Sequence, residues 1–136
     1  MRMRLIAILV LPCALFLGPT SGKAQTATFT GNEFRAWCQQ ALVQDASHQT
    51  KKEALEATHC LGYLSGAGDV FKLWQKSTLE HGGGNPSPVC LPTPSVKVDD
   101  LVHVVLKFLN DHPNRLHEAY PSLVLAAFSD AYPCKR

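Results

Sequence analysis

Four cysteines follow the N-terminal segment of this 136-residue chain and carry its most reactive side-chain chemistry: Cys38, Cys60, Cys90 and Cys134. A thiolate can act as a nucleophile or bind zinc, whereas two thiols in an oxidising compartment form a disulfide. Because the chain begins with a pattern typical of an export signal and the number of remaining cysteines is even, we predict two disulfides instead of a reactive thiol.

The histidines do not form a pattern typical of a metal site. His59 and Cys60 are adjacent, so their side chains point in different directions on a helix. The five-residue step from His112 to His117 does not place both rings on one helical face. We therefore interpret these histidines as solvated residues or residues at the edge of the core.

Adjacent carboxylates occur at Asp99 and Asp100, near the start of a predicted helix. Negative charge at a helix N-terminus is a simpler explanation for this pair than a catalytic dyad. The sequence therefore predicts a protein that is not an enzyme and that carries no cofactor and no metal.

The first 24 residues resemble a cleaved signal peptide. Arg2 and Arg4 form a basic start, Leu5–Leu17 is almost entirely apolar, and Gly22-Lys23-Ala24 supplies small residues for cleavage after Ala24. The apolar run is shorter than the ~20 residues that a membrane-spanning helix needs, so we expect no stable membrane anchor. Residues 25–136 then form one mature domain.

A lipoprotein signal at Cys13 is the weaker alternative, because Pro12 stands where a small residue is expected. Cleavage after Ala24 also removes three positive charges from a net charge of +2, which leaves the mature chain near −1 with neutral histidines. No stripe of lysine and arginine remains, so the composition argues against nucleic-acid binding.

Apolar residues recur at three- and four-residue steps in four stretches and predict an all-α domain of four to five helices. The stretches are residues 32–46, 51–76, 96–110 and 114–132, with a minor strand alternative for 102–106. Pro121 interrupts the last stretch. Either the helix kinks there or a new helix starts with Pro121 in its first turn, and we favour the second.

Three glycines, Gly62, Gly66 and Gly68, weaken the second predicted helix, since each costs about 1 kcal/mol relative to alanine. Gly62 and Gly66 are four residues apart and share one face. We predict that they allow close packing of another helix, because a phosphate-binding loop would need a preceding strand, and none is indicated.

Four cysteines allow three disulfide pairings. If the first two helices form an antiparallel hairpin that turns near His48, Cys38 and Cys60 lie at nearly equal heights and can face each other. This arrangement leaves Cys90 to pair with Cys134, which fastens a long proline-rich loop to the C-terminal end. We therefore predict Cys38–Cys60 and Cys90–Cys134.

That loop, residues 78–95, contains the segment that we consider for partner binding: His81, Gly82, Gly83, Gly84 and Asn85. Loops held on a rigid helical scaffold are frequent recognition elements. A plain flexible connection explains the same glycines equally well.

In combination these residues resemble the Rap/Tai-type immunity proteins associated with type VI secretion. The resemblance covers almost the whole mature chain and includes Thr30-Gly31-Asn32-Glu33, Cys60-Leu61-Gly62-Tyr63, Val89-Cys90-Leu91-Pro92, His112-Pro113 and Tyr132-Pro133-Cys134. It implies a periplasmic, all-helical protein, often a homodimer, that neutralises a protein effector such as a peptidoglycan-cleaving amidase. The alternative is a small periplasmic acid chaperone of the HdeA type, which would expose apolar surface at low pH.

Overall fold

The computed structural model describes residues 29–81, 85–94 and 96–134. The predicted signal peptide therefore lies outside the described residues. The described residues form four α-helices: α1 (Gly31–Ala41), α2 (Lys51–His81), α3 (Val98–Asp111) and α4 (Tyr120–Ala131). Two short 3-10 helices, Ala46–His48 and Pro113–Arg115, lie in the connections. The all-α prediction is confirmed, and the stretch 102–106 is helical, not a strand.

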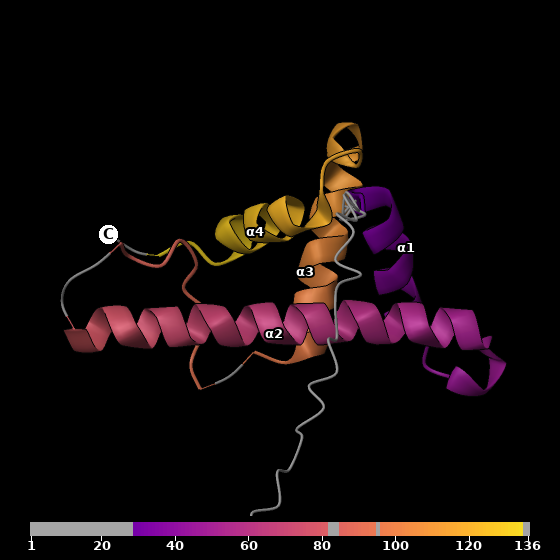
Figure 1. Cartoon of the computed structure of the whole chain (residues 1–136), viewed down its shortest axis with the longest axis horizontal. Coiled ribbons are helices and arrows are strands. Elements are labelled where there is room, and N and C mark those ends of the chain that lie inside the picture. The colour runs from indigo at the N-terminus through magenta and orange to yellow at the C-terminus, as the bar shows by residue number, and fades with distance from the viewer. Residues whose placement is uncertain (1–28, 82–84, 95, 135–136) are drawn as a thin grey trace, which may run out of the picture.

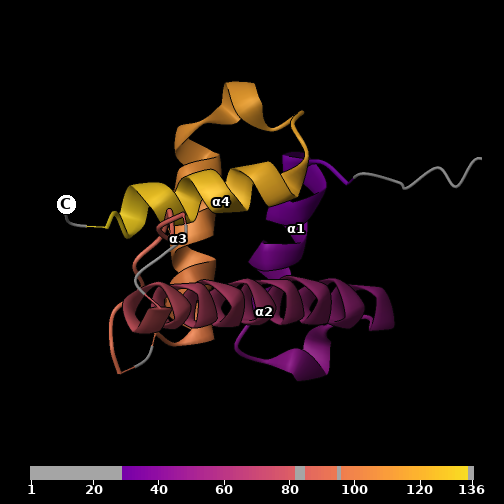
Figure 2. The same ribbon diagram turned by 60° about the vertical axis from the view of Figure 1, so that its left-hand side comes forward.

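Helix α2 contains 31 residues and extends along the whole length of the molecule (Figure 1). Helices α1 and α3 stand steeply across it, and α4 lies above it on the other side of the core, as both views show (Figure 2). The expected antiparallel hairpin of the first two helices is therefore wrong in its geometry. The two helices meet where α1 ends, and they diverge from there.

The helix starts follow from local sequence. Thr30 and Glu33 form a capping box, in which the Thr30 backbone N–H donates to the Glu33 carboxylate at 2.8 Å. Thr50 and Glu53 repeat this contact at 2.7 Å before α2. Pro121 lies in the first turn of α4, where its missing N–H costs no helical hydrogen bond. The prediction that a new helix starts there is confirmed.

The core lies where the four helices meet. Its largest fully buried side chains are Phe34 from α1, Leu64 from α2, Leu109 from α3, and Leu123 and Phe128 from α4. Phe34 stacks on the ring of Tyr120 with centroids 4.5 Å apart. Each helix thus contributes at least one side chain that leaves water, which favours a single arrangement of all four.

The contacts of the α2 glycines differ from those that the sequence predicted. A Cβ at Gly62 or Gly66 would meet nothing within 4 Å, so none of the other described helices packs closely there. The close contact is at Gly68, where a Cβ would lie 3.1 Å from Leu101 Cδ1 of α3. The prediction that Gly62 and Gly66 allow close packing of another helix is therefore wrong for the described residues, and Gly68 has such a contact instead.

Candidate functional site

Both predicted disulfides are present. Cys38 and Cys60 join the end of α1 to α2 with Cα atoms 5.2 Å apart, and Cys90 joins Cys134 with Cα atoms 4.9 Å apart. All four cysteines are consumed in these bonds, so their sulfurs are structural. Any functional surface must therefore be built from other side chains or from the backbone.

Two of the three histidines considered for zinc pack against neighbouring residues, and the third, His117, is exposed. His59 lies edge-on to the indole of Trp37 at a centroid distance of 4.5 Å. The Nδ1 atom of His112 lies 2.8 Å from the Phe108 carbonyl oxygen, and its ring stacks on Phe108 at 4.2 Å. Within residues 29–81, 85–94 and 96–134, no group of three or more His, Cys, Asp or Glu side chains is placed to hold a metal ion.

The predicted partner-binding segment lies at the C-terminal end of α2. His81 is the last residue of that helix, Gly82, Gly83 and Gly84 lie outside the described residues, and Asn85 is exposed. The indole N–H of Trp74 donates to the Asn85 carbonyl oxygen at 2.9 Å. The chain is thus fixed to α2 on both sides of the glycine run.

A second set of contacts holds the chain that follows Asn85. The Leu91 backbone N–H donates to Gln75 Oε1 at 2.9 Å, and the Cys90 N–H donates to the Tyr132 carbonyl oxygen at 2.9 Å. Leu91 itself is buried. Together with the Cys90–Cys134 bond, these contacts tie the segment to α2 and to the residues after α4.

The surface beside this frame is apolar and hollowed. Leu79 is 85 % exposed although it is a large aliphatic residue. A depression of about 330 Å³ lies next to it. Its lining includes Lys72, Gln75, Lys76, Leu91, Pro92 and Pro94. This end of α2 therefore combines a fixed backbone and an exposed apolar side chain with two lysines that line the depression.

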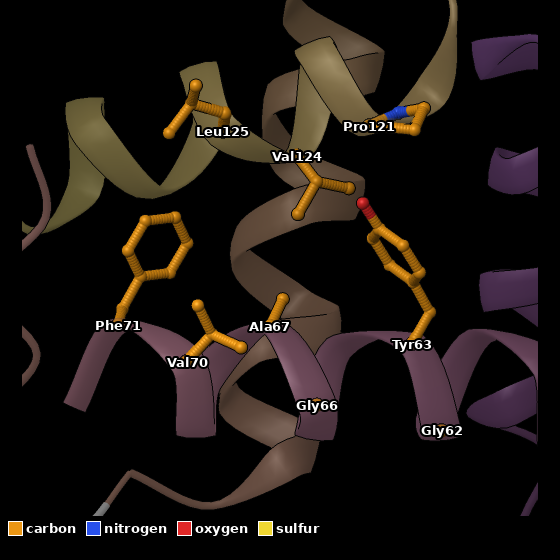
Figure 3. A pocket seen from close by; sticks show the side chains of 9 residues that line it. All are labelled: Gly62, Tyr63, Gly66, Ala67, Val70, Phe71, Pro121, Val124 and Leu125. Atoms are coloured by element: carbon orange, nitrogen blue, oxygen red, sulfur yellow. The ribbon is translucent and has the colours of Figure 1, made fainter. Parts of the chain in front are cut away.

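A larger groove of about 530 Å³ separates α2 from α4 (Figure 3). Tyr63, Ala67 and Phe71 point from α2 toward Pro121 and Val124 of α4, and Gly62 and Gly66 lie at its edge. Burial raises the pKa of the Tyr63 hydroxyl above its ordinary value of 10.0. Sequence analysis missed this groove, because its two walls are 50 or more residues apart in the chain, although the paired glycines on one face were a signal.

None of the helices in the described residues is long and apolar enough to span a lipid bilayer.

Comparison with known proteins gives one match. The model of the family described as Rap1a immunity proteins matches residues 30–134, which include all four helices and all four disulfide-bonded cysteines. No curated protein and no solved structure matches the chain significantly.

Proposed function

Because the chain belongs to the Rap1a immunity protein family, we propose that it binds and neutralises a secreted effector that cleaves peptidoglycan, of the amidase type. The observation that carries this proposal is the family match across the entire described fold. An immunity protein acts by binding its effector, so its surface must complement the effector in shape and polarity. This role requires no catalytic residue.

The proposed site of action is the periplasm. The domain contains two disulfides, and such bonds persist in an oxidising compartment. The amino-terminal pattern of basic, apolar and small residues supports export and cleavage after Ala24.

Processing gives a direct check of this location. N-terminal sequencing of protein recovered from the periplasm should begin at Gln25. Recovery of an intact Met1 from the periplasm would contradict the proposed signal peptide.

We propose the His81–Asn85 segment as the part that enters the effector's site. Glycines permit close approach of the backbone to a concave surface. The Trp74 contact to Asn85 and the Cys90–Cys134 bond hold the chain that follows the glycines. The segment therefore loses less conformational entropy when it binds the effector. The apolar Leu79 side chain lies nearby for contact with the effector.

We also propose that the mature protein is a homodimer. Large apolar side chains remain exposed along α2, among them Leu55, Val70, Leu73 and Leu79. Three of these residues, Leu55, Val70 and Leu73, lie on one side of α2, and a second copy would remove them from water.

The function is tested by co-expression. A peptidoglycan amidase encoded beside this chain should lyse cells when it is exported alone and should be tolerated when the chain is exported with it. Alanines at Gly82 to Gly84 should weaken protection while thermal stability changes little, and alanine at exposed Lys51, at the opposite end of α2, serves as the control. Failure to protect, combined with suppression of aggregation only at low pH, would support the acid-chaperone alternative.

A further inference from the structure

The two disulfides differ in how far solvent reaches them. Cys38 and Cys60 are fully buried and belong to the hydrophobic core. Cys90 and Cys134 are partly exposed. A thiol opens a disulfide by direct attack of its thiolate on a sulfur atom, so access to the sulfur decides which bond reacts first. The folded protein therefore presents one of its two disulfides to a reductant.

A surface depression leads to the exposed bond. The depression has a volume of about 150 Å³, and both Cys90 and Cys134 belong to its lining. The rest of the lining comes from the end of α2 and from the chain that returns after it: Gln75, Thr78, Leu79, Pro86 and Ser87. Leu79 is 85 % exposed. A protein that brings a thiol to this bond would bury the Leu79 side chain, which favours the encounter.

The surroundings of Cys134 suit a thiol as well as a disulfide. The Ser87 carbonyl oxygen lies 3.2 Å from the Cys134 Sγ atom. A disulfide sulfur carries no hydrogen, so it cannot donate to this oxygen. A Cys134 thiol carries one and can donate to it. The reduced state therefore has a hydrogen-bond acceptor already in place.

Other contacts hold the two cysteines together when the bond opens. The Cys90 N–H donates to the Tyr132 carbonyl oxygen at 2.9 Å, and the Leu91 N–H donates to Gln75 Oε1 at 2.9 Å. Val89 and Leu91, on either side of Cys90, are buried. None of these contacts involves sulfur. Two thiols held near each other have a high effective concentration, so the bond can form again.

We propose that the Cys90–Cys134 bond, in addition to its structural role, is a reversible redox site that a protein dithiol of the Cys-X-X-Cys class reduces in the folded protein. The buried Cys38–Cys60 bond stays closed under the same conditions. Reduction releases the residues after α4 from their covalent tie to the loop that follows α2. This site is separate from effector binding and does not depend on it.

The chemistry is thiol–disulfide exchange. One thiolate of the reductant attacks one sulfur of the Cys90–Cys134 bond and forms a mixed disulfide, while the other cysteine leaves as a thiolate and takes a proton from water. The second thiolate of the reductant attacks the reductant's own sulfur in the mixed disulfide and releases the remaining cysteine, which is also protonated. The protein gains two electrons and two protons, and the dithiol becomes a disulfide.

Timed reduction tests the difference in access. The mature protein is treated with dithiothreitol, free thiols are alkylated with iodoacetamide at intervals, and peptide masses identify the labelled residues. Cys90 and Cys134 should become labelled at least about 100-fold faster than Cys38 and Cys60, because the buried pair reacts only after the core opens. The helical signal in circular dichroism should persist through the first labelling. Similar rates for both pairs, or loss of helical signal together with the first labelling, would overturn the proposal.

A protein dithiol tests the surface around the bond, and reduced thioredoxin is the probe. Leu79→Ser should slow reduction by thioredoxin by at least about 10-fold, the effect of losing the burial of one leucine. The rate with dithiothreitol should stay the same, since a small dithiol needs no such contact. Leu73→Ser is the matched control, because Leu73 is exposed on the same helix and does not line the depression. Failure of thioredoxin to reduce the bond, or equal slowing by both substitutions, would contradict a site for a protein dithiol.

Reoxidation tests reversibility. After removal of the reductant, oxidised glutathione should restore the Cys90–Cys134 bond as the main product. The Leu91 amide should stay protected from hydrogen exchange in the reduced protein, because Gln75 still accepts its N–H. Stable glutathione adducts on both cysteines, or loss of protection at Leu91, would show that the frame does not hold the thiols together. None of these measurements uses an effector, so their failure leaves the immunity function untouched.

Discussion

At the scale of single residues, Gly31 shows most clearly why the chain needs its particular amino acids. Its backbone N–H donates to the Glu118 carbonyl oxygen at 2.9 Å, at the start of α1. A Cβ there would lie 2.4 Å from Leu123 Cδ1 and 3.2 Å from the Leu116 carbonyl oxygen. The first turn of α1 therefore packs directly against the segment that leads into α4, with no room for a side chain.

We predict that Gly31→Ala destabilises the protein by about 1–3 kcal/mol, the usual cost of overpacking. The physical reason is that Leu123 is fully buried and the Leu116 contact is with backbone, so neither neighbour can withdraw freely. Urea denaturation measures the difference. Asn32→Ala, at the next and exposed position, should change the free energy of unfolding by less than about 0.5 kcal/mol. Equal stability of the Gly31 and Asn32 variants would show that position 31 can accommodate a side chain.

At the scale of elements, sequence periodicity identified the four described α-helices but not the angles at which they cross. The expected range 32–46 ends five residues later than α1. The Ser47 backbone N–H donates to the Asp45 carboxylate at 3.0 Å, a contact that favours a turn over a further turn of α-helix. The second helix continues to His81, beyond the expected residue 76. Trp74 and Gln75 bind the returning chain, and these long-range contacts have no local signature in the sequence.

The two-glycine face illustrates the same limit. Spacing correctly placed Gly62 and Gly66 on one side of a helix, but it could not tell whether that side meets α3, α4 or another molecule. The structure places Gly68 against Leu101 and leaves Gly62 and Gly66 uncovered. Which face of a helix is buried depends on the positions of distant elements, so a local pattern cannot decide it.

Gln75 provides a prediction at this scale. Its Oε1 atom accepts from the Leu91 N–H at 2.9 Å, and its Nε2 atom donates to the Leu91 carbonyl oxygen at 3.4 Å. Gln75→Ala leaves a buried backbone donor without a partner, so we expect a loss of about 1–3 kcal/mol in stability. The Leu91 amide proton should also exchange faster with solvent by NMR.

The neighbouring Lys76→Ala is the control for this effect, because Lys76 is exposed and makes only a surface ion pair with Glu80 at 3.7 Å. Unchanged exchange at Leu91 in the Gln75 variant would mean that the loop is held by the disulfide alone.

At the scale of the whole molecule, each of the two disulfides joins segments that are distant in the sequence. They close loops of 22 and 44 residues. The chain-entropy model gives about 3 kcal/mol for the shorter loop and about 4 kcal/mol for the longer. Against a typical stability of about 5–15 kcal/mol, either bond is a large fraction.

We therefore predict that replacing either cysteine pair by serine, Cys90 with Cys134 or Cys38 with Cys60, lowers stability by about 3–4 kcal/mol or more. Serine in the fully buried Cys38 and Cys60 positions adds a desolvation cost, so alanine variants should be compared as well. Thermal unfolding of the four proteins measures the losses. An alanine variant at Cys90 and Cys134 that unfolds at the wild-type temperature would contradict the prediction.

The candidate site was only partly predictable for the same reason as the fold. The cysteines, the export pattern and the family resemblance can be read along the chain, because each depends on residue types in order. The α2–α4 groove and the frame around Asn85 depend on distant segments that meet in space, so they became visible only in the structure.

The central claim is that this chain neutralises a secreted effector by binding it. Isothermal titration of the mature protein into a candidate peptidoglycan amidase, taken from a gene beside its own, tests this claim most directly, with amidase activity measured on the same samples. We predict saturable binding at a fixed stoichiometry, with a dissociation constant of about 10⁻⁸ M or below, and loss of peptidoglycan cleavage as the sites fill. Absence of binding heat together with undiminished cleavage, for a correctly disulfide-bonded protein, would contradict it.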